Sequence, residues 1–208
     1  MSVAAYYVPT FPERSGFANH NHARAVTSES KRSILLSNNK VPKDLKKDSD
    51  KCYIVDGENP LAKARSAFDL ISELPLTDTT VITSFHYEAA AAGWLASRKG
   101  YDWVVDLNDP PIQYRLNNPR THHQLTTRVL ERLLNQADHG IHSAHPDTPH
   151  SYGQERSYLP NGTPAASMSP SYSSRNQIKM TFVGSPRAGR GGKLLIDSLG
   201  ILREPPTV

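Results

Sequence analysis

The 208-residue sequence has a single cysteine, Cys52, and no apolar run long enough to cross a membrane. One cysteine cannot form an internal disulfide, and its isolation fits a reducing compartment. A spanning helix needs about 20 predominantly apolar residues, so we expect no transmembrane segment. Residues 1–9 have neither the basic nor the long apolar segment of a signal peptide. The sequence therefore predicts a cytoplasmic rather than a secreted protein.

Signatures of several enzyme classes are also missing. The first strand–helix turn has no Gly-x-Gly-x-x-Gly, which argues against an unrelated dinucleotide-binding enzyme. No Gly-x-Ser-x-Gly motif marks a hydrolase nucleophile. His139 and His142 are three residues apart on an expected strand, so they would face opposite sides, and no cysteine accompanies them. We expect no metal site and no cofactor.

Five lysines and three aspartates occur between residues 40 and 51. A solvated loop is the simpler interpretation of such a run. The alternative is a peripheral contact with an anionic membrane, at the inner face in a cytoplasmic protein, where each lysine adds about 1 kcal/mol. Aromatic residues are not interleaved with these lysines, so we do not expect a nucleic-acid partner.

Short apolar runs alternate with helical patterns along the chain. The expected strands are residues 2–8, 33–36, 53–55, 80–83, 103–107, 140–143 and 156–159. Two apolar stripes predict amphipathic helices between them: Leu61, Ala64, Phe68 and Ile71, then Leu125, Val129, Leu133 and Ala137. A third helix, near residues 86–98, is rich in alanine and is expected to be buried or to lie close against a neighbouring backbone. This alternation predicts an α/β fold with a doubly wound, Rossmann-like parallel sheet.

The composition also suggests domain boundaries. Residues 161–177 are rich in Pro, Ser, Gly and Ala and contain one charged side chain, Arg175, as expected of a linker. Residues 1–160 would form the first domain. Residues 178–208 read as the first strand and helix of a second domain, with a glycine-rich, arginine-bearing turn between them. Such a turn suits phosphate binding, because glycines let backbone N–H groups approach an anion at a helix N-terminus.

In a doubly wound sheet, ligands bind beyond the carboxyl ends of the strands. Gly16 lies in the loop after the first strand, and His86 begins the alanine-rich helix. Asp106, Asn108 and Asp109 form a polar corner at the end of the fifth strand. These groups could orient the hydroxyls of a ligand. The alternatives are a simple turn at Gly16, a structural histidine, and an Asp–Pro turn.

Six pieces in order resemble the family 4 (group 1) glycosyltransferases of the GT-B fold. They are the Gly16 loop, residues 81–86, residues 103–109, residues 137–141, the Pro-Asn-Gly element at residues 160–162, and residues 181–191. The sequence departs from the family at Asn108, where histidine is common, and at Ser185, where arginine is usual.

The resemblance implies transfer of a sugar, with retention, from a nucleotide-sugar donor to a glycan or lipid acceptor. It assigns catalytic positions to His86, Asn108 and Asp109. It assigns donor diphosphate binding to Gly184, Arg187, Arg190 and Gly191, and an acceptor-side loop to Gly16. No metal is required, because the arginines neutralise the leaving group.

The chain ends six residues after Leu202, before the acidic donor motif of that family. We therefore expect a truncated form, weakly active or inactive alone, for which a partner could supply the missing domain. The alternative is a non-catalytic sugar- or partner-binding remnant, or the product of an interrupted gene.

Overall fold

The computed structural model describes residues 3–11, 18–107, 121–142 and 152–159. The chain divides into two units, Met1–Pro164 and Ala165–Val208, and all of the described residues lie in the first. The expected linker and the expected second-domain segment lie outside them.

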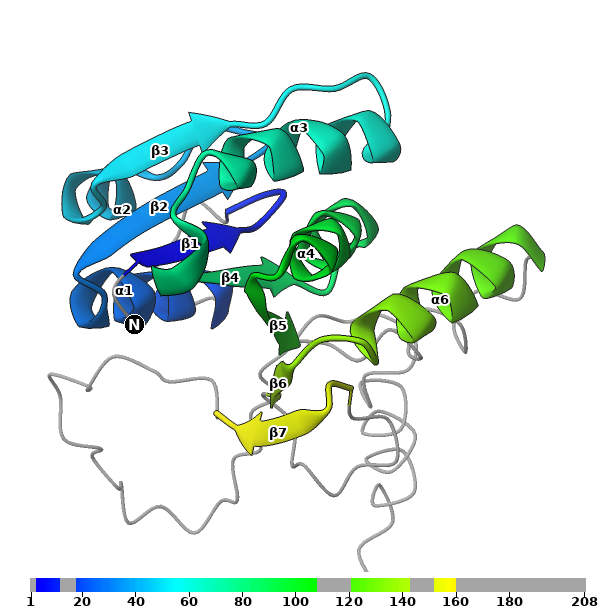
Figure 1. The fold of residues 1–208 in the computed structure, drawn as a ribbon. Coiled ribbons are helices and arrows are strands. Elements are labelled where there is room, and N and C mark those ends of the chain that lie inside the picture. Colours follow the sequence, from blue (N-terminus) through cyan, green and yellow to red (C-terminus); the bar gives the residue numbers. More distant parts are fainter. Residues whose placement is uncertain (1–2, 12–17, 108–120, 143–151, 160–208) are drawn as a thin grey trace, which may run out of the picture. The chain divides into compact units, whose positions relative to one another are not determined.

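The described residues form one seven-stranded sheet in the order β3-β2-β1-β4-β5-β6-β7 (Figure 1). Every neighbouring pair is parallel. The strands are β1 Val3–Tyr7, β2 Arg32–Ser37, β3 Lys51–Ile54, β4 Thr79–Ser84, β5 Asp102–Leu107, β6 His139–His142 and β7 Glu155–Tyr158. All seven correspond to strands expected from the sequence, and the predicted fold class, an α/β Rossmann-like doubly wound sheet, is confirmed.

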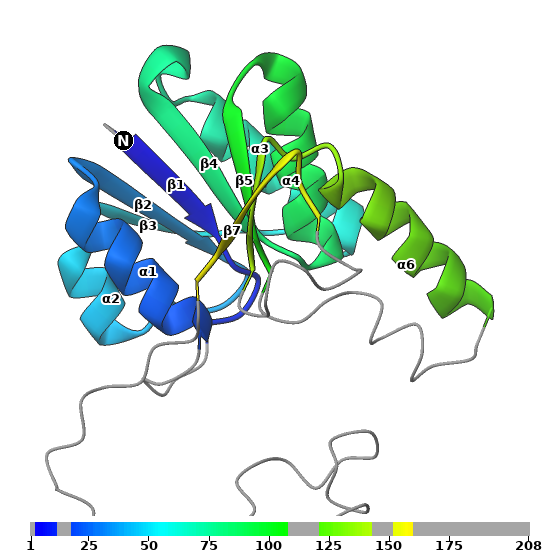
Figure 2. The same cartoon turned by 90° about the horizontal axis from the view of Figure 1, so that it is seen from below.

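Helices cover both faces of the sheet. They are α1 Ala18–Glu29, α2 Lys43–Asp48, α3 Pro60–Ser72, α4 Tyr87–Lys99 and α6 Thr121–Leu134, with a short 3-10 turn at Leu76–Asp78. Figure 2 shows α1 and α2 on one side of the sheet and α3, α4 and α6 on the other. The central strands are therefore buried on both faces, as the unbroken burial of β1 shows.

Alternate residues of β1 feed two separate cores. Ala4 and Tyr6 belong to the core under α1 and α2, whereas Ala5 and Tyr7 belong to the core under α3 and α4. Both tyrosines are buried, yet each ends in a hydroxyl near the carboxyl end of the strand. The same strand thus sends one polar group to each face at the same edge of the sheet.

The alanine-rich helix α4 is buried, as predicted, and its small side chains allow a close approach to β5. A Cβ on Gly93 would lie 2.1 Å from Nε1 of Trp103, far inside van der Waals contact. The indole of Trp103 is fully buried and donates from Nε1 to Oγ1 of Thr83 at 2.8 Å. Gly93 therefore sets the spacing between α4 and the strand that carries the polar corner.

The stripe predicted for α3 is partly wrong. Asn59 caps the helix by accepting a hydrogen bond from the backbone N–H of Ala62 at 2.9 Å. The buried residues are Ala64, Ala67 and Ile71, whereas Leu61 in the first turn is 63% exposed. The part of α3 that packs on the core begins at Ala64.

The stripe predicted for α6 is also wrong at its start. Leu125 is 64% exposed and Val129 is 38% exposed. Leu134 is buried, and Leu130 packs beside it. A strict spacing of four residues drifts by about 40° per step around a helix of 3.6 residues per turn. The predicted stripe therefore reaches the buried face only at its end, where Leu133 packs against a core and Ala137 is buried.

Candidate functional site

The direction of strand connections changes between β1 and β4. From β1 the chain passes through α1 to β2, and from β4 it passes through α4 to β5, on the opposite face and in the opposite direction. Such a switch point opens a crevice at the carboxyl ends of the strands, where doubly wound proteins bind ligands. After β1 the backbone stays attached to β2, because Pro9 O accepts from the N–H of Asn38 at 3.0 Å and from Ser37 Oγ at 3.1 Å.

A buried polar cluster lies at this edge on the α1 face. Asp106, from β5, receives a hydrogen bond from the hydroxyl of Tyr6 on β1. The same oxygen, Oδ2, lies 2.9 Å from Nδ1 of His22 on α1. Tyr6, His22 and Asp106 are 0%, 8% and 1% exposed. Burial raises the pKa of the Tyr6 hydroxyl well above its usual value, and the charge and hydrogen bond of Asp106 raise it further. Tyr6 therefore stays protonated and donates.

Two atoms of this cluster have no partner among the described residues. They are Oδ1 of Asp106 and Nε2 of His22, and both are buried. Buried polar side-chain atoms nearly always have a hydrogen-bond partner, and an unpaired one costs free energy. The pair thus retains hydrogen-bonding capacity at the edge where ligands of this fold class bind.

A second polar group lies on the α3 and α4 face of the same edge. The Tyr7 hydroxyl donates to Oδ1 of Asn38 at 2.6 Å. Nδ2 of Asn38 then donates to Oε1 of Glu88, in the first turn of α4, at 3.2 Å. Burial raises the pKa of Tyr7, and the negative charge of Glu88 adds to the effect. Asn38 and Glu88 are half-buried, so this chain of hydrogen bonds leads from the core to the surface.

His86, a predicted catalytic residue, lies at the switch point. It precedes the first residue of α4 in extended conformation, with φ −66° and ψ 147°. Its Nδ1 lies 3.0 Å from Oγ of Ser84, and its ring stacks on Phe85 with centroids 4.6 Å apart. Ser84 is the register partner of Asp106, so both side chains project from the same face of neighbouring strands. Ser84 therefore places His86 near the buried cluster.

The other predicted site residues lie outside the described part of the chain. These are Gly16, Asn108, Asp109, Gly184, Arg187, Arg190 and Gly191. Asn108 directly follows the last residue of β5. Asp106 was predicted to belong to the polar corner, but its contacts with Tyr6 and His22 were not predicted. No local pattern announces them, because the three residues come from three separate elements.

The histidines of β6 have structural partners. Nε2 of His139 lies 2.8 Å from Ser157 Oγ, and Nε2 of His142 lies 3.1 Å from the carbonyl oxygen of Tyr152. Burial lowers the pKa of His142. Within the described ranges, no three His, Cys, Asp or Glu side chains come together as metal ligands.

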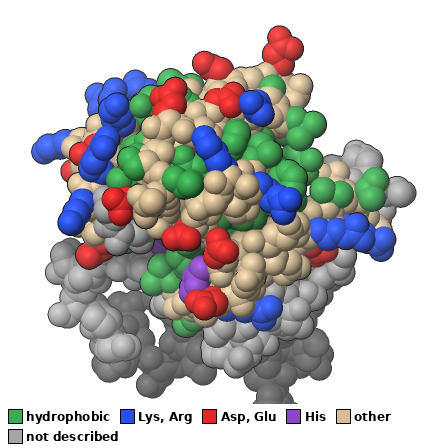
Figure 3. All heavy atoms as spheres, viewed as in Figure 1, with side chains coloured by type: hydrophobic (Ala, Val, Ile, Leu, Met, Phe, Trp, Pro, Cys, Tyr) green, Lys and Arg blue, Asp and Glu red, His purple; other side chains and the backbone are tan. Residues whose placement is uncertain are grey.

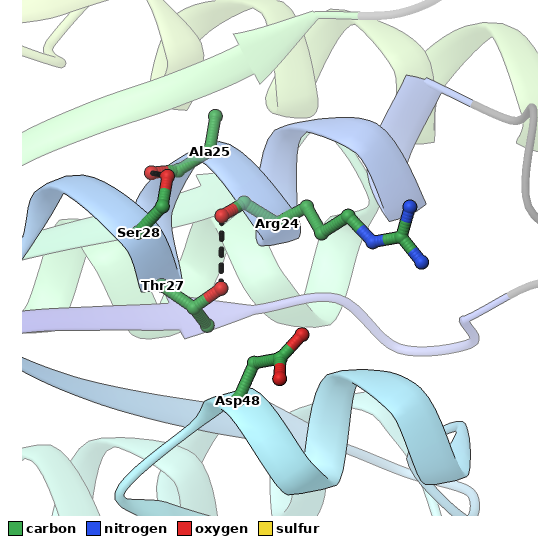
Figure 4. A pocket seen from close by; sticks show the side chains of 5 residues that line it. All are labelled: Arg24, Ala25, Thr27, Ser28 and Asp48. Carbon is green, nitrogen blue, oxygen red and sulfur yellow. Dashed lines mark hydrogen bonds between the residues drawn. The ribbon is translucent and has the colours of Figure 1, made fainter. Parts of the chain in front are cut away.

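A surface hollow lies between α1 and α2 (Figure 4). Its lining residues are Arg24, Ala25, Thr27, Ser28 and Asp48. Thr27 Oγ1 donates to the carbonyl oxygen of Arg24 at 2.8 Å, while the guanidinium of Arg24 donates to Asp44 at 2.9 Å. The hollow is formed by the second half of α1, which runs back from the carboxyl edge, and we assign no function to it.

Residues 40–51 are not a loop. They include α2 and the start of β3, and Val41 and Leu45 are buried in the core beneath α1 and α2. All five lysines of this segment are exposed, and the space-filling view shows basic side chains gathered over this end of the sheet (Figure 3). Among the described helices, none combines the length and apolar character needed to span a bilayer.

Comparison with known proteins does not identify the chain. No family model matches it, and no curated protein matches it either.

Proposed function

We propose that this chain contributes the acceptor-binding domain of a glycosyltransferase that uses a nucleotide-sugar donor. The observation that carries the proposal is the gathering of hydroxyl, amide, carboxylate and imidazole groups at the switch point of a doubly wound sheet. Tyr7, Asn38 and Glu88 reach this edge on one face, and Tyr6, His22 and Asp106 on the other. Such groups suit a neutral ligand rich in hydroxyls, which needs both donors and acceptors.

His86 has the best position to contact an acceptor. It precedes α4 at the switch point, and its contacts with Ser84 and Phe85 hold the ring in one orientation. In the proposed role it orients the acceptor hydroxyl, which converts a bimolecular encounter into a positioned attack. Asn108 and Asp109, which follow β5 in the sequence, would complete the acceptor side.

The donor side of the proposal depends on the resemblance described above. Arg187 and Arg190, with the glycines around them, would bind the donor diphosphate. In the transfer step the acceptor oxygen bonds to the anomeric carbon, and its proton passes to the departing diphosphate oxygen. The bond from that carbon to the diphosphate oxygen breaks, and its electron pair leaves with the nucleoside diphosphate. Arginine side chains stabilise this developing charge, and the family implies retention at the anomeric carbon.

The proposal is tested by isothermal titration calorimetry, which measures the binding of UDP, GDP and ADP to the full 208-residue chain. We expect at least one of them to bind, and Arg190→Ala to weaken that binding about tenfold or more, since charge-assisted bonds to phosphate are lost. Arg65→Ala is the matched control, because Arg65 lies on the surface of α3 and pairs with Asp69. If none of the three binds, or if both variants weaken binding equally, the proposal is wrong.

Turnover separates the enzyme from a binding remnant. The chain is incubated with UDP-glucose, GDP-mannose and ADP-glucose and a panel of glycan and lipid-linked acceptors. Sugar transfer that His86→Ala diminishes supports an enzyme. Binding of both ligands without transfer supports the non-catalytic sugar-binding alternative.

A further inference from the structure

The unpartnered atoms of the Tyr6–His22–Asp106 cluster have a defined chemistry. Oδ2 of Asp106 already accepts from Tyr6 and contacts Nδ1 of His22. Oδ1 of Asp106 and Nε2 of His22 remain, and both are buried without a partner among the described residues. Because Tyr6 and His22 both contact Oδ2 of Asp106, the carboxylate and the imidazole are fixed relative to each other, and so are their two unpartnered atoms.

The protonation of His22 decides which ligand groups fit. Its contact with a carboxylate places a proton on Nδ1. Nε2 then accepts a hydrogen bond in the neutral ring and donates one in the charged ring, while a carboxylate oxygen only accepts. A hydroxyl group can donate to Oδ1 and can either donate to or accept from Nε2. A phosphate oxyanion only accepts and has no proton to donate to Oδ1, so it does not match this pair.

We propose that His22 Nε2 and Asp106 Oδ1 each bind a hydroxyl group of a neutral polyhydroxy ligand. This inference rests on the proposed function and names the part of the acceptor that the chain recognises. Asp106 lies next to Ser84, whose hydroxyl contacts His86. A sugar bound here would therefore place one hydroxyl at Nε2 of His22 and another at Oδ1 of Asp106, and could extend towards His86.

The chain offers a matched control for this site. His20 lies two residues from His22 on the same helix, is also buried, and also contacts an aspartate, Asp44, through Nε2 at 2.7 Å. That pair joins α1 to α2 and has no contact with Asp106 among the described residues. A variant at His20 thus removes a comparable histidine–carboxylate contact without changing the proposed site.

The test uses the full chain with ¹⁵N-labelled histidine, titrated with methyl α-glucoside, methyl α-galactoside and methyl α-mannoside. We expect at least one glycoside to shift the side-chain nitrogen signals of His22 and not those of His20. Asp106→Asn and His22→Gln should each raise Kd about tenfold or more, because hydrogen bonds to a charged or oriented group are lost. His20→Gln should leave Kd unchanged. If Asp106→Asn fails to fold, His22→Gln carries the test with His20→Gln as its control.

Two results would overturn the inference. One is that no glycoside, titrated up to its own solubility limit, shifts the His22 signals, which would mean that the cluster binds only water. The other is that His20→Gln weakens binding as much as His22→Gln, which would make the effect structural. The two proposals fail separately. Shifts at His22 without nucleotide binding would support the hydroxyl-binding site and contradict the proposal of a glycosyltransferase. Arg190-dependent nucleotide binding without shifts at His22 would do the reverse.

Discussion

Gly93→Ala should destabilise the protein, although alanine is the better helix former. In the middle of an exposed helix this change would stabilise by about 1 kcal/mol. Here the new Cβ would lie 2.1 Å from Nε1 and 2.4 Å from Cε2 of Trp103. The indole is fully buried and cannot turn aside without moving β5 or breaking its hydrogen bond to Thr83.

The magnitude follows from these terms. Overpacking a close-packed core costs about 1–3 kcal/mol, and the lost indole hydrogen bond costs about 1 kcal/mol. The higher helix propensity of alanine, about 1 kcal/mol, offsets the cost of the lost hydrogen bond. We therefore expect the free energy of unfolding to fall by ~2 kcal/mol, measured by urea denaturation followed by circular dichroism.

A double-mutant cycle checks the cause. Trp103→Phe removes the atoms closest to the new methyl group, so Gly93→Ala should cost much less in a Trp103→Phe background than in the wild type. The reasoning is refuted if Gly93→Ala raises the free energy of unfolding, or if its cost is the same in both backgrounds. In either case α4 and β5 would not be as close as the structure shows.

Three further predictions concern single contacts. Asn59→Ala should lower the free energy of unfolding by about 1 kcal/mol through loss of the helix cap, and Asn59→Asp, which can still accept from Ala62, should restore most of it in urea denaturation. Burial raises the pKa of Asp44, but hydrogen bonds from His20 and the backbone outweigh it, so the pKa lies below its usual value; the stability advantage over Asp44→Asn should be present above the ordinary pKa of aspartate and disappear as the pH falls through the lowered value, and a difference that instead grows in acid would contradict this. The raised pKa of Tyr7 means that the native state holds this proton more tightly than the unfolded chain, so the free energy of unfolding should fall as the pH rises above the usual pKa of tyrosine. In an absorbance titration of the native protein, the Tyr7 hydroxyl should not ionise at the usual pKa of tyrosine. Tyr7→Phe should reduce the loss of stability at alkaline pH.

The fold could be predicted because its signals are local. The central strands β1, β2, β4 and β5 are short runs rich in apolar residues, and helix caps such as Asn59 mark where the next helix begins. Helix faces were harder to predict. Leu125 and Val129 continue an apolar pattern, yet the sheet contacts α6 through Leu130 and Leu134, and which face is buried depends on the docking of the helix.

The site was only partly predictable for the same reason. The position of His86 before a helix, and of Asp106 at the end of a strand, can be inferred from the sequence because strand ends share an edge. The choice of Tyr6 and His22 as partners of Asp106 cannot, since it depends on how α1 lies across the sheet. His20 and His22 are two residues apart, about 200° around the helix, so they face different neighbours: His20 contacts α2 and His22 contacts β5.

The hydrogen bonds to Asp106 also constrain the order in which the protein can assemble. They join residues separated by 100 and 84 positions, and β1 and β5 are not neighbours in the sheet, since β4 lies between them. Contacts so distant along the chain form late, after the intervening segment has closed its loop. During synthesis, Tyr6 and His22 therefore have no contact with the Asp106 carboxylate until more than a hundred residues have been made. The polar cluster can thus form only after β5 has joined the sheet, and its presence reports that β1, β4 and β5 have come together.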